Sequence, residues 1–279
     1  MIGKEGRLDS ELCLDLPLSG ETIRIAQITD THLEDTLGGK LLGMDTDNSL
    51  GHVLKLVEQQ GSFDLMLATG DIANHGSMAA YHRFLEYSSA LPFPVCWLMG
   101  NHDNAQMMTS ASGKPIVRKI LIGGWQIVLL DSTIPGEVGG RLGVAELRLL
   151  QSCLQEHPER HVLVVLHHHP VPIGCDWLDE QQVENAEELF AIIDAQPNVR
   201  GLLWGHVHQQ FDVMRGQCRL LCSPSTCVQF ASNSCDFKTD DVAPGYRWLD
   251  LHPDGHIETQ VERVAGVVFD YDHDSTGYE

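Results

Sequence analysis

Short apolar segments recur along this 279-residue chain, and several of them end in residues of the kind that bind metal ions. Several of the segments are continuously apolar, which is typical of strands buried on both faces of a sheet. They span residues 22–29, 63–69, 93–99, 125–131, 161–167 and 198–204. This pattern restricts the chain to a layered fold with a buried sheet.

Helical segments separate these strands. Four ranges carry apolar residues at the i, i+3, i+4 spacing of an amphipathic helix: 47–60, 77–90, 144–157 and 185–196. Alternation of strand and helix predicts βαβ units and a largely parallel sheet, hence an α/β fold. After Trp204 the pattern changes to antiparallel strands and hairpins, with a turn at Asp254-Gly255. We therefore expect a second sheet, mainly from the C-terminal third, to pack on the first.

The chain carries no Pro/Gly/Ser-rich linker that would divide it. A chain of this length can bury one large core. We predict a single domain over residues 1–279, with a core from about residue 16 to residue 264. The acidic segment 265–279 is expected to be a flexible tail.

The acidic charge of the chain limits its partners. Its net charge is −21, from 18 Lys and Arg and 39 Asp and Glu residues. Nucleic acids and anionic membranes bind basic surfaces, so we expect neither as a partner. The first 20 residues lack the apolar stretch of a signal peptide, and no segment approaches the ~20 apolar residues of a membrane span. We expect a cytoplasmic protein, either a monomer or a homodimer.

The eight cysteines are scattered without Cys-x-x-Cys spacing. A chain of this size does not need disulfides, so reduced thiols are expected. A zinc site formed by Cys218, Cys222 and Cys227 stays open as an alternative.

Asp, Asn and His residues follow five of the predicted strands. The carboxyl ends of parallel strands face one crevice, so residues distant in sequence converge there. Each residue alone could be a helix cap, a turn residue or a strand-end polar group, but five such strand ends together indicate one site. The residues are Asp30, His32, Asp71, Asn101, His102, Asp103, His167, His168, His169, His206 and His208.

This set of side chains predicts two metal ions. Carboxylate and amide oxygens mixed with imidazoles suit Mn²⁺, Fe or Zn²⁺. Two Asp, one Asn and at least four His exceed what one metal with an open coordination position can use. A bridging carboxylate is then needed to hold two cations ~3.5–4 Å apart, and Asp71 is the natural candidate.

The five strand ends resemble the calcineurin-like metallophosphoesterase superfamily. Its pattern is Asp-x-His, Gly-Asp, Gly-Asn-His-Asp/Glu, a strand-end His and Gly-His-x-His. The corresponding blocks here are Asp30-Thr31-His32, Gly70-Asp71, Gly100-Asn101-His102-Asp103, His167 and Gly205-His206-Val207-His208. The resemblance implies an α/β fold of four layers, an αββα sandwich of two mixed sheets, with a dinuclear metal site.

The resemblance also implies which residues surround each metal. The first would be held by Asp30, His32, Asp71 and His208, and the second by Asp71, Asn101, His167 and His206. His167 is chosen from the three consecutive histidines because it lies against the strand end. His168 and His169 are left to support the ligands or to touch substrate.

Longer segments narrow the resemblance to the bacterial 3′,5′-cyclic AMP phosphodiesterases of class III. They are VLHHHPVPIGCDWLD, PSTCVQF and APGYRWLDLHPDG. The resemblance implies that a hydroxide bridging two divalent metals, with Fe or Mn favoured and Zn as an alternative, attacks cyclic AMP to give 5′-AMP.

Residue roles follow from this interpretation. His102 would donate a proton to the leaving oxygen or stabilise the charged equatorial oxygens of the phosphoryl group. Asp103 would hold His102 through a hydrogen bond, or would only structure the loop. The substrate would lie against His32, Asp71, Asn101, His102 and His208, with Trp177 and Thr226 as candidates for contacts to the base and ribose unless they serve packing alone.

The ligand set leaves other substrates open. A related enzyme acting on 2′,3′-cyclic nucleotides, phosphomonoesters or other phosphodiesters would carry the same metal ligands. A catalytically silent binding module is disfavoured because every ligand type is retained. A nuclease is disfavoured by the acidic balance of the chain.

Overall fold

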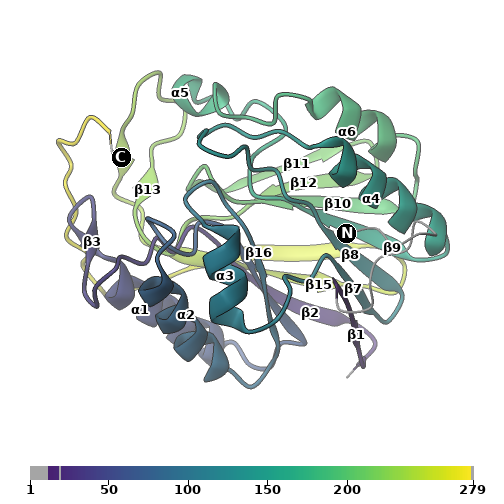
Figure 1. Cartoon of the computed structure of the whole chain (residues 1–279), viewed down its shortest axis with the longest axis horizontal. Coiled ribbons are helices and arrows are strands. Elements are labelled where there is room, and N and C mark those ends of the chain that lie inside the picture. Colours follow the sequence, from purple (N-terminus) through teal and green to yellow (C-terminus); the bar gives the residue numbers. More distant parts are fainter. Residues whose placement is uncertain (1–11, 19, 278–279) are drawn as a thin grey trace.

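Two β-sheets lie face to face, and helices cover both outer faces, which makes four layers (Figure 1). The structure is a computed structural model and describes residues 12–18 and 20–277. One sheet has seven strands and the other has five. The predicted α/β class and αββα sandwich are therefore confirmed.

The five-stranded sheet has the order β16-β15-β2-β5-β6. β2, β5 and β6 run parallel, whereas β15 pairs antiparallel with both β2 and β16. Helices α1, α2 and α3 belong to this half of the sandwich. The bounds are β2 Ile23–Ile28, β5 Leu65–Thr69, β6 Val95–Leu98, β15 Gly245–Leu251, β16 Ile257–Arg263, α1 Thr46–Gln59, α2 Met78–Ser89 and α3 Ala105–Ser112.

The seven-stranded sheet has the order β1-β7-β8-β9-β10-β12-β11, and β8, β9, β10 and β12 are parallel. Helices α4 and α6 lie on its outer face (Figure 1). The bounds are β1 Cys13–Leu16, β7 Lys119–Ile122, β8 Trp125–Leu129, β9 His161–Val165, β10 Val199–Trp204, β11 Phe211–Arg215, β12 Cys218–Cys222, α4 Val144–Glu156 and α6 Ala186–Ile193. Smaller elements are β3 Lys40–Leu41, β4 Met44–Asp45, β13 Gln229–Phe230, β14 Thr239–Asp240 and the short helix α5 Asp176–Asp179.

Three apolar clusters fill the spaces between the four layers. One lies between the seven-stranded sheet and its helices, and a second between the five-stranded sheet and α1 to α3. The third lies between the sheets and includes Ile25, Leu67, Leu163 and Leu203. The strands read as continuous apolar runs because one face of each sheet meets helices and the other meets the partner sheet.

A buried glutamine ties the carboxyl ends of the two sheets together. Gln27, in β2, donates to Thr69 Oγ1 in β5 at 2.8 Å and to the carbonyl of Trp204 in β10 at 3.1 Å. Its own Oε1 accepts from the Ser223 hydroxyl. These bonds satisfy polar groups that would be costly to bury unpaired, and they hold the two sheets at one level where the site lies.

The division of strands between the sheets differs from the expectation. The predicted parallel strands do not form one sheet: β2, β5 and β6 lie in one, and β8, β9 and β10 in the other. The antiparallel β7–β8 hairpin after α3 belongs to the seven-stranded sheet, where β7 pairs with β1. The C-terminal third does not form the second large sheet, because β11 and β12 extend the seven-stranded sheet and β15 pairs with β2.

The described part of the C-terminal segment lies against the rest of the fold. The half-buried Phe269 packs against both outer apolar clusters, and the amide of Asp272 donates to the carbonyl of Leu42 at 2.6 Å. The flexibility of residues 265–279 stays a prediction. Residues 278 and 279, like 1–11, lie outside the described residues.

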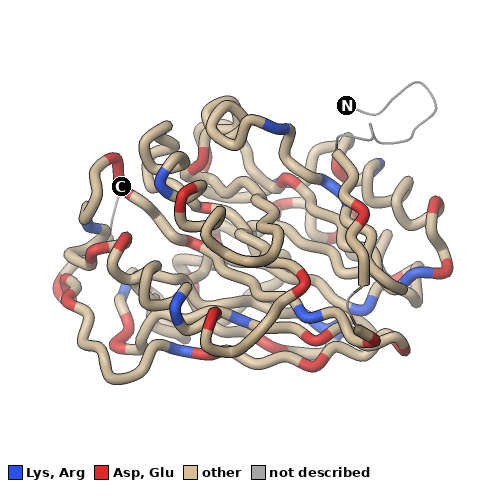
Figure 2. The backbone as a smooth tube through the Cα atoms, turned by 90° about the horizontal axis from the view of Figure 1, so that it is seen from below, with Lys and Arg blue, Asp and Glu red and all other residues tan. Residues whose placement is uncertain are grey.

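The described helices include none long and apolar enough to cross a membrane. Acidic positions are spread over much of the described chain, with basic positions interspersed (Figure 2). The structure thus shows the same acidic excess that the composition shows.

The cluster between the sheets should contribute strongly to stability. We expect Leu203→Ala to lower the free energy of unfolding by about 2–5 kcal/mol, because it leaves a cavity between two sheets that cannot close around it. Val268→Ala, at a side chain that is 91% exposed, should change it by less than about 0.5 kcal/mol. Denaturant unfolding of both variants measures the difference, and equal effects would contradict this packing.

Candidate metal centre

The carboxyl ends of strands from both sheets meet at one edge of the sandwich, and the predicted ligands lie there. Four overlapping groups of side chains could each hold a metal ion. They are Asp30, His32 and His208; Asp30, Asp71 and His167; His32, Asp71 and His102; and His167, His168 and His206. Asn101 joins them, since its Oδ1 lies 3.1 Å from Nδ1 of His206. None of these groups contains a cysteine, so within the described residues the alternative zinc site of three cysteines finds no support.

Backbone conformation aims these side chains into the site. Asp30, His32, Asp71, His206 and His208 all have positive φ, between +44° and +68°. A residue other than glycine rarely adopts this conformation, which costs of order 1 kcal/mol or more. Five such residues at one sheet edge indicate that the surrounding structure enforces the geometry of the site.

Two glycines let neighbouring segments approach the ligands. A Cβ on Gly205 would lie 2.0 Å from Thr29 Oγ1 and 2.8 Å from Asp30 Oδ2. A Cβ on Gly100 would lie 2.2 Å from Asp71 Oδ1. The glycines that precede Asn101 and His206 are therefore required by space, which explains their place in the sequence pattern.

Two histidines turn unprotonated nitrogens toward each other. Nδ1 of His32 lies 3.0 Å from Asn74 Oδ1, and Nδ1 of His208 lies 2.7 Å from the carbonyl of Val228. Both oxygens only accept hydrogen bonds, so each Nδ1 carries the proton and each Nε2 carries a lone pair. The two Nε2 atoms are 3.2 Å apart. Two lone pairs at this distance repel each other unless a cation lies between them.

The distances between these donor atoms fit coordination of one shared cation. Two ligand atoms that each lie ~2.1 Å from one tetrahedral cation are roughly 3.4 Å apart. Nε2 of His208 is also 3.5 Å from Asp30 Oδ1, and Nε2 of His32 is 3.8 Å from Asp71 Oδ2. These four residues thus present lone pairs to one point.

His167 and His206 complete the arrangement on the other side of Asp71. Nδ1 of His167 donates to the carbonyl of Thr69 at 2.8 Å, and its Nε2 lies 3.2 Å from Asp71 Oδ2. His206 has the opposite orientation: its Nε2 lies 3.0 Å from Gln181 Oε1, and its Nδ1 faces Asn101. Asp71 therefore lies between the two groups, as a bridging carboxylate must.

The electrostatics favour positive charge at this point. Burial raises the pKa of Asp71, but His167 and His102 more than offset it and hold that pKa well below its ordinary value. Burial lowers the pKa of His167, yet Asp71 and Asp30 raise it to about 9. Burial and the nearby His102 lower the pKa of His32 to about 3, which keeps this ring neutral. Ionised carboxylates beside a neutral ring are what a divalent cation binds.

The structure gives Asp103 the contacts of a loop anchor. Its carboxylate accepts from the amides of Gly100, Ile72 and Ala73 at 3.0 to 3.2 Å, and from the Tyr81 hydroxyl at 3.0 Å. Burial and the negative charge of Asp71 raise its pKa to about 6.

The ring of His102 is held by a different residue. Its Nδ1 pairs with the carbonyl of Asn74 at 2.9 Å, and its amide donates to Asp71 Oδ1. Of the two roles left open for Asp103, structuring the loop is the one that its carboxylate contacts describe.

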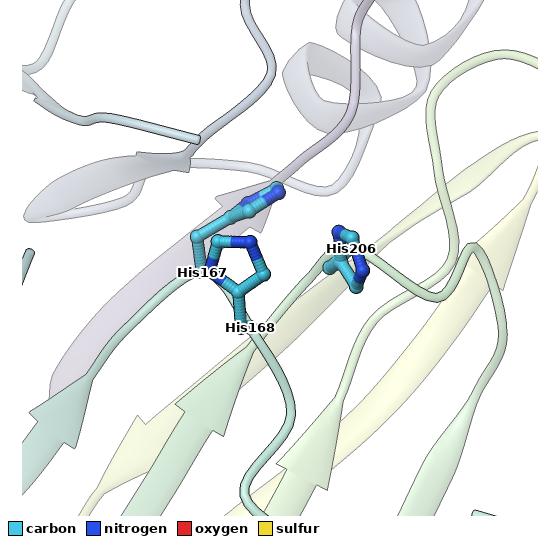
Figure 3. Close-up of side chains that lie close together, drawn as sticks. All are labelled: His167, His168 and His206. Carbon is cyan, nitrogen blue, oxygen red and sulfur yellow. The ribbon is translucent and has the colours of Figure 1, made fainter. Parts of the chain in front are cut away.

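His168 is already engaged by the protein. Its Nδ1 pairs with the Ser132 hydroxyl at 2.8 Å and its Nε2 with the carbonyl of Val138 at 3.0 Å. Figure 3 shows the rings of His167, His168 and His206 gathered at the ends of neighbouring strands. His169 is fully buried and stacks on His206, with ring centroids 5.8 Å apart. Among the three consecutive histidines, these contacts leave His167 as the one that faces the carboxylates of Asp30 and Asp71.

The two candidate substrate contacts differ in exposure. Trp177, in α5, is half-buried and packs edge-on against Phe230, whose ring stacks on His208 at 4.3 Å. Thr226 is fully buried; its amide donates to the carbonyl of Thr29, and its own carbonyl accepts from the Ser49 hydroxyl. Trp177 thus reaches His208 only through the ring of Phe230, whereas Thr226 is enclosed by the protein; contacts of either residue with a substrate stay a prediction.

Sequence reasoning missed the residues that orient the histidines. Asn74 pairs with His32 through its side chain and with His102 through its carbonyl, and Glu34 fixes its amide by accepting from Nδ2 at 2.8 Å. Gln181 likewise pairs through its side chain with the ring of His206. Asn74 lies three residues after Asp71, a proximity that could have singled it out, but nothing in the sequence marks Gln181.

The residues present fit a pair of divalent cations. Imidazoles, carboxylates and one amide oxygen converge on two adjoining points that share Asp71. These donors suit Fe, Mn or Zn, and the observed geometry does not distinguish among these metals.

Comparison with known proteins agrees with this geometry. The family model described as "Calcineurin-like phosphoesterase" matches residues 23–210. The "3′,5′-cyclic adenosine monophosphate phosphodiesterase CpdA" of Pseudomonas aeruginosa is 48% identical over 94% of this chain and 97% of its own length. The protein of the same name from Escherichia coli K12 is 45% identical over 96% of this chain and 100% of its own.

Solved structures show the same fold at low identity. A dimetal phosphatase from Danio rerio covers 88% of this chain, and all of its own is matched, at 16% identity and a TM-score of 0.59. A purple acid phosphatase from yellow lupin covers 91% of this chain with 54% of its own matched, at 13% identity and a TM-score of 0.63.

A methyl group at position 205 should damage the metal site. We expect Gly205→Ala to weaken metal binding by about 10–100-fold, because the new Cβ displaces Thr29 and the ligand Asp30. Gly51→Ala is the matched control: Gly51 lies inside α1 with no atom near its added Cβ, and this change should leave metal binding unaltered. Metal content after dialysis measures both, and an unaffected Gly205→Ala variant would contradict the assigned geometry.

Proposed function

This chain belongs to the calcineurin-like phosphoesterase family, and we propose that it is a metal-dependent phosphodiesterase that hydrolyses 3′,5′-cyclic AMP to 5′-AMP. The assignment of the substrate rests on the similarity, over nearly the whole chain, to two bacterial enzymes named for this reaction. The set of inward-facing lone pairs and carboxylates supports the chemistry. A cytoplasmic location suits an enzyme that acts on an intracellular nucleotide.

The proposed ligands follow from the facing donor atoms. Asp30, His32, Asp71 and His208 hold the first cation. Asp71, Asn101, His167 and His206 hold the second. Fe or Mn fits this set best because oxygen donors are mixed with imidazoles, and Zn is the alternative. Bound cations supply positive charge that acidifies a water nucleophile and neutralises the phosphoryl oxygens.

The chain itself organises the proton transfer. Water adds its oxygen to phosphorus, the bond from phosphorus to the 3′ oxygen breaks, and that oxygen must gain a proton. His102 is the proposed donor, since it is half-buried beside His32, with ring centroids 4.8 Å apart. Donation from its Nδ1 to the carbonyl of Asn74 fixes the ring plane. An imidazole transfers protons readily near neutral pH.

Other residues hold the donor and the substrate. Asp103 is a positioning residue: it binds the amides of the loop that carries Asn101 and His102. Trp177 is the proposed contact for the base, because its ring belongs to the aromatic cluster that reaches His208 through Phe230. Thr226 contributes by supporting the Asp30 segment through its backbone bond to Thr29.

Substrate choice can be measured on the metal-loaded protein. We expect faster hydrolysis of 3′,5′-cyclic AMP than of 2′,3′-cyclic AMP or a phosphomonoester, with 5′-AMP as the product identified by chromatography. Hydrolysis of the other two esters with 3′,5′-cyclic AMP left intact would overturn the substrate and leave the metal chemistry standing.

His102 and Asp71 should fail in different ways. His102→Ala should lower kcat by about 10²–10⁴-fold with both metals retained, because only the proton donor is lost. Asp71→Asn should lose metal as well as activity, because the shared carboxylate is gone. His82→Ala, at an exposed position in α2, serves as the control and should match the wild type. Metal loss in His102→Ala, or full metal retention in Asp71→Asn, would contradict these roles.

A further inference from the structure

One of the four ligand histidines is oriented differently from the others. His32, His167 and His208 each pair through Nδ1 with a protein oxygen and turn Nε2 into the site. His206 pairs through Nε2 with Gln181 Oε1 at 3.0 Å and turns Nδ1 toward Asn101. The side chain of Gln181 is thus the partner that distinguishes His206 from the rest.

We propose that Gln181 is a positioning residue for the second metal, because it selects the nitrogen with which His206 binds. This inference rests on the proposed metal pair and adds to it a residue outside the ligand set. An amide oxygen only accepts hydrogen bonds, so the contact with Gln181 Oε1 favours the neutral ring that carries its proton on Nε2. Nδ1 then keeps its lone pair for the cation.

Removal of the acceptor would reverse this preference. A buried N–H without a partner is costly, so the proton of His206 would move to Nδ1, where Asn101 Oδ1 lies 3.1 Å away and can accept it. A protonated Nδ1 cannot bind a metal. The ring has little room to turn over instead, because it is 5% exposed and contacts the rings of His168 and His169.

Gln181 is itself held firmly. Gln181 follows α5, and its backbone N–H donates to the carbonyl of Leu178 at 2.8 Å. Two residues later, the amide of Val183 donates to the carbonyl of His169 at 2.9 Å. The segment that carries Gln181 is therefore fixed on both sides. One of these two bonds joins it to His169, which stacks on His206.

The contact is specific to one metal. Gln181 touches His206, which belongs to the second group, whereas His32 and His208 of the first group rely on Asn74 and on a backbone carbonyl. A change at position 181 should therefore separate the two metals.

Three variants test the inference through metal binding alone. Gln181→Met keeps a side chain of similar length without an acceptor, and Gln181→Glu keeps the acceptor. Gln209→Met is the matched control, because Gln209 is buried next to His208 and its side chain bonds to Ala231 and Ser232. Competition with a chelator gives the dissociation constants for the two equivalents of Zn²⁺.

We expect Gln181→Met to weaken one equivalent by about 10–100-fold and to leave the other unchanged. Gln181→Glu and Gln209→Met should bind both equivalents like the wild type. Imidazole ¹⁵N spectra of the zinc-loaded wild type should show one metal-bound Nδ1, lost or exchanging in Gln181→Met.

Contrary results are distinguishable. Unchanged binding in Gln181→Met, or equal weakening of both equivalents, would overturn the role of Gln181 alone. A wild-type protein that binds fewer than two equivalents would overturn the metal pair and this inference with it. Two bound metals without hydrolysis of 3′,5′-cyclic AMP would overturn the proposed substrate and leave the role of Gln181 intact.

Discussion

The structure depends on a cluster of hydrogen-bond acceptors that face one another. Nε2 of His32 and Nε2 of His208 lie 3.2 Å apart, each with its proton committed to the opposite ring nitrogen. Carboxylates of Asp30 and Asp71 surround them. Such an arrangement is repulsive until positive charge enters it, so it identifies a cation site without reference to any known protein. The strained φ values and the crowded glycines at the strand ends are the structural cost of holding these atoms together.

The site exists because the two sheets of the sandwich are aligned at their carboxyl edges. Asp30, Asp71 and Asn101 follow strands of the five-stranded sheet, whereas His167 and His206 follow strands of the other. Neither sheet alone could build the centre, and the ligands meet only because the two carboxyl edges are level. Gln27 fixes that level within the core, and the bond from His167 to the carbonyl of Thr69 fixes it at the site itself. Slippage of the sheets would therefore separate the candidate ligands.

The sequence singled out the side chains that the structure brings together at this edge, because each follows soon after a largely apolar strand. Convergence of strand ends is a property of the fold, so the site could be inferred before the sheets were known. The division of strands was not predictable in the same way, because the local pattern of β8 is no different from that of β5. Asn74 and Gln181 were missed because an orienting residue needs only one correctly placed oxygen, and many chain positions can supply it. Thr226 was singled out by its segment, and only the structure shows that it is enclosed by the protein.

The most direct test of the account is the position of metal in crystals of the protein grown with Mn²⁺. Anomalous diffraction should show two peaks on either side of Asp71, one against Nε2 of both His32 and His208 and the other against Asn101 Oδ1 and Nδ1 of His206. A single peak, or a second peak bound through Nε2 of His206, would contradict the assignment of these lone pairs and the two-metal chemistry built on it.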